Sequence, residues 1–252
     1  MLQAHGVSLN LSGQTVLRDV DLSIQPGQWT CIVGPNGAGK SSLLKVLAGL
    51  WPCEGCIELQ GRNLLDWAPQ KRAQCLSWLG QDEVVSEDLC VWDIVMLGRL
   101  PHQDWWGTIS AEDERIVTSC LKALHAWDWR HRSVRQLSNG ERQRVLLARL
   151  LAVQAQVVLM DEPLANLDPP HQVDWLTQVR ALVTQGRTVV TVLHEIGMAL
   201  HANHVIVMQS GTVMHHGLGG AAETHQAIER VFEHRIQIQA LHGQWVVLPA
   251  MR

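Results

Sequence analysis

A glycine-rich segment near the N-terminus has the residue types and the spacing of a phosphate-binding loop. It follows the pattern G-x-x-x-x-G-K-[ST], extended by one serine: Gly34, Pro35, Asn36, Gly37, Ala38, Gly39, Lys40, Ser41 and Ser42. Glycines allow successive backbone N–H groups to point at phosphate oxygens, and Lys40 would place a positive charge on the β- and γ-phosphates. The Ser41 hydroxyl is suited to Mg²⁺. The segment therefore predicts a site for a nucleoside triphosphate with Mg²⁺.

The residues on both sides of this loop predict the strand and the helix that must position it. Residues 29–33 form an apolar, β-rich run that stops at Gly34. Residues 40–50 place leucines and a valine at the spacing of one helix face. The N-terminus of a helix carries unpaired N–H groups and a partial positive charge. A strand, a tight turn and a helix in this order therefore favour phosphate binding.

Two carboxylates follow a second apolar run and supply chemistry that a phosphate loop alone lacks. Residues 157–160 are unbroken apolar sequence, typical of a strand buried on both faces of a parallel sheet. Ligands of open α/β sheets bind beyond the carboxyl ends of the strands. We therefore predict Asp161 as a Mg²⁺ ligand and Glu162 as the base that accepts a proton from the attacking water. The alternative is a pair of solvated carboxylates at a strand end.

The segment Leu-Ser-Asn-Gly-Glu-Arg-Gln-Arg at residues 137–144 predicts a second anion site. Ser138 and the N–H groups around Gly140 precede residues 141–153, which have helical periodicity. They would lie at the N-terminus of that helix, where backbone donors and the helix dipole favour an anion. Taken alone, the segment is also typical of an ordinary N-capped helix.

Together, these motifs resemble those of the ATP-binding subunits of ABC transporters. In that family a Leu-Ser-Gly-Gly-type signature precedes a helix, and the strand with its two carboxylates follows. Here Asn139 replaces the usual first glycine and Glu141 the common glutamine, while Ser138 and Gly140 remain. The resemblance implies that Ser138, Gly140 and Glu141 bind the ATP held by a second subunit. The active form would then be a head-to-tail dimer with two ATP molecules between the chains.

The resemblance also assigns roles to single positions. Gln81 matches the glutamine that touches Mg²⁺ or water and senses the membrane partner. Asp168 matches the aspartate of the D-loop, and His194 matches the switch histidine that reaches the γ-phosphate. Each of them alone would have a structural explanation. The family usually stacks adenine on an aromatic residue, but the matching position is Leu11, so adenine would rest on Leu11 and Val16 by apolar contact.

The order of predicted elements indicates an α/β fold, because strands alternate with helices along much of the chain. The resemblance implies a P-loop NTPase core with a mixed sheet, an antiparallel β-subdomain and an inserted helical subdomain. We expect a single domain over residues 1–252 with three parts: a nucleotide-binding core (1–82 and 155–215), a helical subdomain that carries the signature (83–154) and a C-terminal extension (216–252).

Two further segments make the resemblance more specific. Residues 95–102 and 232–249 are similar to those of importer ATPases for iron-siderophores, haem and cobalamin. This similarity implies permease subunits and a second ATPase subunit as partners, a binding protein as an indirect partner, and a place at the cytoplasmic face of the membrane. Residues 83–106 would receive the coupling helix of the permease. The alternative is an amphipathic helix that packs on its own subdomain.

Composition limits the remaining classes of function. The chain has 252 residues, a formal net charge of −4 and no block of basic residues, so we expect no nucleic-acid partner. A soluble ABC ATPase acting on DNA or ribosomes would usually carry two cassettes or a long coiled coil. A P-loop kinase would need neither the signature nor His194. An ABC ATPase for another substrate, in import or export, stays open.

A C-x-x-C pair at Cys53 and Cys56 does not belong to any of these motifs. No second pair follows at the spacing of a zinc site, so the pattern favours reduced thiols over a metal or redox centre. No run approaches the eighteen or so apolar residues that a membrane helix needs, and the N-terminus does not have the pattern of a signal peptide.

Overall fold

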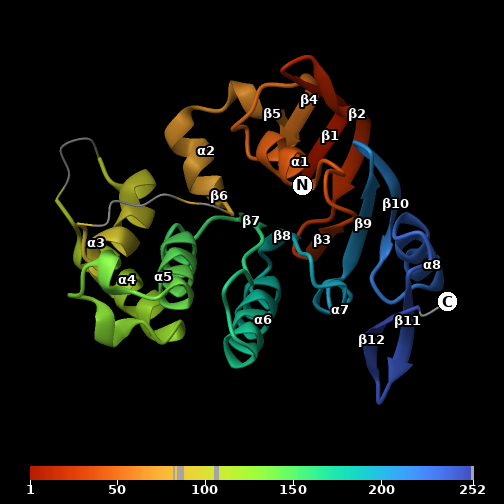
Figure 1. Cartoon of the computed structure of the whole chain (residues 1–252). Helices are drawn as coiled ribbons and strands as arrows, with labels where there is room; N and C mark the ends of the chain where they lie inside the picture. The colour runs from red at the N-terminus through yellow and green to blue at the C-terminus, as the bar shows by residue number, and fades with distance from the viewer. Residues whose placement is uncertain (82, 84–87, 105–107, 251–252) are drawn as a thin grey trace. The chain divides into compact units, whose positions relative to one another are not determined.

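The computed structural model describes residues 1–81, 83, 88–104 and 108–250, with the elements labelled in Figure 1. The chain forms two compact units. The first unit joins residues 1–67 with residues 183–252, and the second consists of residues 68–182. The predicted subdomain boundaries remain a prediction.

An antiparallel sheet in the first unit contains the N-terminal strands. Its order is β2-β1-β4-β5, and the strands are β1 (Leu2–Leu11), β2 (Gln14–Ile24), β4 (Glu54–Leu59) and β5 (Arg62–Asn63). In β1 the buried residues are Leu2, Ala4, Val7 and Leu9, and the pairing with β2 shifts register between Ala4 and Val7. The irregularity keeps all four apolar side chains on the buried face, which strict alternation would not do.

A mixed sheet in the same unit positions the phosphate loop. Four of its strands, β3 (Trp29–Val33), β8 (Thr188–Val192), β9 (His204–Gln209) and β10 (Thr212–Leu218), lie in the order β10-β9-β3-β8. β3 pairs in parallel with β8 and β9, while β10 is antiparallel to β9. Every residue of β3 and β8 is buried, as expected for central strands of a sheet covered on both faces.

The other elements of the first unit are mostly helical. They are α1 (Lys40–Leu47), the 3-10 helix η1 (Leu64–Asp66), α7 (Ile196–Ala199), α8 (Ala222–Val231) and the hairpin of β11 (Ile236–Leu241) and β12 (Gln244–Pro249). α1 follows β3 directly after the phosphate loop, and it buries Leu43, Leu44, Val46 and Leu47. The C-terminal part of the unit thus consists of one helix followed by a hairpin around Gly243.

The second unit combines two parallel strands with a group of helices. Its elements are α2 (Pro69–Cys75), β6 (Leu76–Leu79), α3 (Val91–Met96), η2 (Leu97–His102), α4 (Ala111–Ala123), η3 (Trp127–Trp129), η4 (Val134–Gln136), α5 (Asn139–Ala152), β7 (Val157–Asp161) and α6 (Pro169–Thr184). β6 and β7 pair in parallel. α5 packs against α3 and α4, and a buried ion pair between Arg99 Nε and Asp113 Oδ1, 2.8 Å long, joins η2 to α4.

The predicted α/β class with a mixed sheet and an added group of helices is confirmed. Some predicted helix boundaries were wrong. The helix predicted at residues 40–50 ends at Leu47. Residues 91–99 have the periodicity of one helix, but the α-helix ends at Met96 and a 3-10 helix containing Pro101 follows it. Proline cannot donate the backbone hydrogen bond that would continue the α-helix. The helix predicted from Glu141 begins at Asn139, because Ser138 caps it.

Among the described residues, no helix is both long and apolar enough to cross a lipid bilayer.

Candidate functional site

The phosphate loop joins β3 to α1 and leaves the start of α1 without a side-chain cap. The N-cap residue is Gly39, with a φ of 94°, and no side chain accepts a hydrogen bond from the first turn. Gly34 also needs to be glycine: its φ is 150°, and a Cβ atom there would lie 2.2 Å from the Met208 carbonyl oxygen. The first turn of α1 therefore has no anion of its own, which suits it to a phosphate.

Lys40 supplies the positive charge of this loop. Its side chain is buried, with a relative exposure of 6%. The ammonium Nζ donates to the carbonyl oxygens of Gly34, at 2.9 Å, and Pro35, at 3.1 Å. A buried ammonium requires such partners. These bonds hold the charge at the loop, where phosphate oxygens would be stronger, anionic acceptors.

A cavity of about 220 Å³ adjoins the loop within the first unit. Its lining residues are Val33, Gly34, Pro35, Asn36, Leu193, His194, Ile196 and Phe232. The structure thus brings the predicted switch histidine, His194, beside the phosphate loop. Sequence reasoning missed Phe232, which directly follows α8, because nothing in its local sequence relates it to a phosphate site.

In the second unit, β7 ends at the two predicted carboxylates. Asp161 is buried, with a relative exposure of 1%, and Glu162 is half-buried with a φ of 51°. A positive φ is uncommon for glutamate and is often found at functional sites. Gln81 Nε2 donates to Glu162 Oε2 over 2.8 Å. The structure therefore brings Gln81 and Glu162 together, and this hydrogen bond leaves the amide oxygen of Gln81 available as a ligand.

The signature segment forms a capping box at the N-terminus of α5. The Glu141 backbone N–H donates to Ser138 Oγ over 3.2 Å, and the Ser138 N–H donates to Glu141 Oε2 over 2.8 Å. The bond from the Ser138 backbone is the main cause that lowers the pKa of Glu141. Ser138 is exposed. Its hydroxyl accepts one hydrogen bond here and still has a proton to donate to an anion.

A second cavity, of about 350 Å³, lies over this helix start and is called the signature pocket below. Its lining residues are Ser138, Gly140, Glu141, Arg144, Asn166, Leu167, Asp168 and His171. A Cβ atom on Gly140 would lie 2.9 Å from the Asn166 carbonyl oxygen, so glycine allows the two segments to approach closely. The structure thus places Asp168 beside Ser138, Gly140 and Glu141.

Asp168 itself is paired inside the signature pocket. Its Oδ1 contacts His171 Nδ1, and this contact is the main cause that lowers the pKa of Asp168. Sequence reasoning missed Arg144 and His171. Both lie on helices at positions where a charged side chain is usually solvated, so the sequence carried no signal that would single them out.

The predicted Mg²⁺ ligands are divided between the two units. Ser41 belongs to the first unit, while Asp161 and Gln81 belong to the second. A hydroxyl, a carboxylate and an amide supply hard oxygen donors, the ligand type that Mg²⁺ prefers. The donor set therefore fits this ion.

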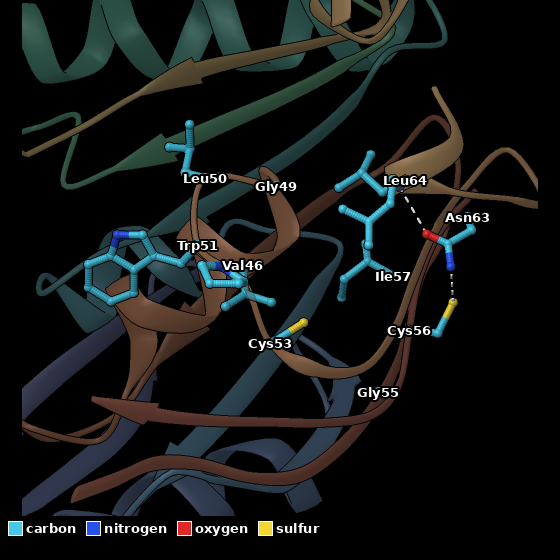
Figure 2. Close-up of a pocket in the computed structure, with 12 residues that line it drawn as sticks. Val46, Gly49, Leu50, Trp51, Cys53, Gly55, Cys56, Ile57, Asn63 and Leu64 are labelled. Carbon is cyan, nitrogen blue, oxygen red and sulfur yellow. Dashed lines mark hydrogen bonds between the residues drawn. The ribbon is translucent and has the colours of Figure 1, made fainter. Parts of the chain in front are cut away.

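The C-x-x-C pair lies at a third cavity, of about 280 Å³, in the first unit (Figure 2). Asn63 Nδ2 donates to Cys56 Sγ over 3.3 Å, and Figure 2 shows the sulfur of Cys56 turned toward Asn63. Burial, with a smaller effect of Cys56, raises the pKa of the Cys53 thiol, which disfavours the thiolate that binds metals. Among the described residues, no group of three or more His, Cys, Asp or Glu side chains could hold a metal ion.

Comparison with known proteins gives a consistent family relationship. A family model described as ABC transporter matches residues 17–165. The hemin import ATP-binding protein HmuV of Pseudomonas putida is 40% identical over 247 residues, covering 95% of each chain. The ferric enterobactin transport ATP-binding protein FepC of Escherichia coli is 33% identical over 256 residues, covering 100% of this chain and 94% of FepC.

Solved structures of ATP-binding cassettes show the same fold. The dimeric, post-hydrolysis state of the ATP-binding cassette MJ0796 bound to ADP and Pi aligns with a TM-score of 0.79 at 25% identity, covering 88% of this chain and 100% of that one. A nucleotide-free ATP-binding cassette from an ABC transporter aligns with a TM-score of 0.78 at 22% identity, covering 92% and 95%. The predicted P-loop NTPase architecture of the ABC type is confirmed.

Proposed function

This chain belongs to the ABC transporter family of ATP-binding proteins, and we propose that it hydrolyses ATP between two copies of itself to drive a membrane importer of a metal chelate. As a member of this family it is an ATPase. The partners, the roles of single residues and the cargo are the proposal.

ATP binding begins at the phosphate loop. The open first turn of α1 would accept the phosphate oxygens, and Lys40 would exchange its bonds to Gly34 and Pro35 for bonds to the β- and γ-phosphates. The remaining residues of the loop provide backbone N–H donors. Adenine would lie on Leu11 and Val16, both half-buried, with less stacking energy than an aromatic ring gives.

The second subunit completes the site. Its exposed Ser138, with the N–H groups at Gly140 and the first turn of α5, would bind the γ-phosphate of the ATP that the first subunit holds. ATP then favours the closed dimer because only that state offers its γ-phosphate a second set of donors. Asp168 lines the same pocket and would contact the facing subunit.

Hydrolysis requires a base for the attacking water. Glu162 has the carboxylate for this role, and its hydrogen bond to Gln81 fixes its orientation. His194, next to the phosphate loop, would contact the γ-phosphate. Ser41, Asp161 and the Gln81 amide oxygen would hold Mg²⁺, which would supply positive charge for the β- and γ-phosphates. Release of phosphate removes the anion that joined the subunits, so the dimer opens.

Coupling to a permease would use the surface predicted at residues 83–106. Of these, residues 84–87, 105 and 106 lie outside the described residues. In the described part, Leu97 and Leu100 are 39% and 56% exposed, apolar side chains that a permease helix would cover. The chain would then lie at the cytoplasmic face of the membrane, bound to permease subunits, with a binding protein as an indirect partner.

The proposed cargo rests on the relatives. HmuV is named for hemin import and FepC for ferric enterobactin transport. Both names refer to chelates of iron, so we propose haem or a ferric siderophore for this chain. Deletion of the chain in its own host, followed by measurement of haem and siderophore uptake, should reduce one of the two and leave the other unchanged. Unchanged uptake of both would contradict the proposed cargo.

The observation that supports the dimer most directly is that Ser138 is exposed at a helix start that lines an open pocket. The test uses Glu162→Gln, which keeps the size of the side chain but removes the base. With ATP and Mg²⁺ this variant should elute as a dimer in gel filtration, and with ADP as a monomer. A variant that stays monomeric in saturating ATP would contradict the mechanism.

A further inference from the structure

Arg144 brings a positively charged side chain to the lining of the signature pocket. It lies one helical turn after Gly140 on α5, so the two residues share a helix face. Its guanidinium carbon lies 4.4 Å from the ring centroid of Trp129, in η3. Stacking on an indole fixes the guanidinium plane but uses none of its N–H donors.

The carboxylates around Arg144 already have other partners. Glu141 pairs with Arg132 at 3.7 Å. Asp168 pairs with His171, and Asp174 lies 3.8 Å from His125 Nε2. Within the described part of the chain, the Arg144 guanidinium forms neither an ion pair nor a hydrogen bond. A cation that is half-buried, held by a ring and still has its donors available is suited to an anion that arrives from outside.

We propose that Arg144 binds the triphosphate of the ATP held by the facing subunit, and that Trp129 is a positioning residue which presents it. This inference rests on the dimer proposed above. Arginine forms two parallel hydrogen bonds with phosphate oxygens, which a lysine cannot do. In its absence, the carboxylates of Glu141 and Asp168 would dominate the charge of the pocket and oppose a polyanion.

The test measures the affinity of the ATP-driven dimer in the Glu162→Gln background, by analytical ultracentrifugation at several protein concentrations. Arg144→Gln should weaken the dimer by roughly 10- to 100-fold, the range of a hydrogen bond to a charged group. Arg130→Gln is the matched control. Its guanidinium also stacks on an indole, that of Trp127, at 4.3 Å, but does not line the signature pocket. The control should dimerise like its parent.

Two further measurements separate phosphate binding from a structural role. Trp129→Leu should weaken the dimer several-fold, and Trp129→Phe, which keeps an aromatic face, should recover most of the affinity. The double variant Ser138→Ala, Arg144→Gln should weaken the dimer by less than the product of the two single fold-changes in affinity, because both residues would bind one triphosphate.

The outcomes distinguish this inference from the function on which it rests. If the Glu162→Gln parent dimerises with ATP but Arg144→Gln dimerises equally well, Arg144 does not bind the triphosphate and only this inference fails. Strictly multiplicative effects in the double variant would also overturn it. If the parent itself never dimerises, the proposed function fails, and the role of Arg144 fails with it.

Discussion

Two helices of this protein begin at a predicted phosphate site, but they begin in opposite ways. α1 starts after a glycine, has no side-chain cap and no acidic residue in its first turn, and carries a buried lysine. α5 starts at a serine that forms a capping box with a glutamate in its first turn. The backbone N–H groups at the start of α1 are open to an anion, whereas some of those at the start of α5 already have a hydrogen-bond partner in their own chain.

This difference predicts different phosphate-binding behaviour at the two sites. An uncapped helix start with a buried cation would bind phosphate strongly within a single subunit. A capped start is stable without a ligand, and its exposed serine and the nearby arginine would act only when an anion reaches them. Strong binding at α1 and conditional binding at α5 would make ATP itself the link between two subunits.

The largest effect should come from removing the cation of the open site. Lys40→Ala removes the buried ammonium of the phosphate loop, and hydrolysis should fall by roughly 10²-fold or more, as when a fixed electrostatic donor is lost. ATP binding by the single subunit should weaken as well. Phosphate release and fluorescent-nucleotide binding measure the two effects. Unchanged turnover would contradict the role of Lys40 at the open helix start.

At the start of α5, substitutions of Ser138 can distinguish its role as a helix cap from its role at the anion site. Ser138→Asp keeps a capping oxygen, so the free energy of unfolding should change by less than about 0.5 kcal/mol. The added carboxylate would repel the triphosphate, and kcat/KM for ATP should fall roughly 30-fold. Ser138→Ala should instead destabilise the protein by about 1 kcal/mol. If Ser138→Asp is fully active, α5 is only a capped helix.

The close approach of Gly140 to Asn166 predicts a smaller effect. Gly140→Ala brings a methyl group to 2.9 Å from a backbone oxygen, so the pocket must widen, at a cost of about 1–3 kcal/mol. ATPase activity should fall several-fold. Gly197→Ala in α7 is the control, because a Cβ atom there would lie 4.0 Å from the Trp245 carbonyl oxygen. This change should be neutral or slightly stabilising. Equal effects of both changes in thermal unfolding would contradict the steric argument.

The smallest effect concerns the charge of the signature pocket. The contact with His171 holds the pKa of Asp168 below its usual range, so the carboxylate contributes stability above the unfolded pKa of about 3.9. That contribution is lost as the pH falls through the lower pKa of the folded state. Asp168→Asn removes it at every pH. The melting temperature of the variant, followed by circular dichroism from pH 5 to pH 3, should therefore fall less steeply than that of the wild type.

Much of the fold could be predicted because its signals are local. The buried runs of β3, β7 and β8 and the alternation of strands with helices indicated the α/β class. Helix boundaries were harder, because a proline and a capping serine override helical periodicity. Local periodicity also cannot show that Gly98 packs so closely on α5 that a Cβ atom would lie 2.3 Å from the Arg149 oxygen.

The sequence alone was enough to predict the phosphate loop, the two carboxylates and the signature, because each is a short segment whose backbone shape follows from its own glycines, serine and apolar neighbours. The distant side chains that share a pocket with them could be identified only from the folded chain. Phe232 lies beside the phosphate loop, and Trp129 holds Arg144 at the signature pocket. These contacts join segments far apart in the chain, and no local pattern of residues encodes them.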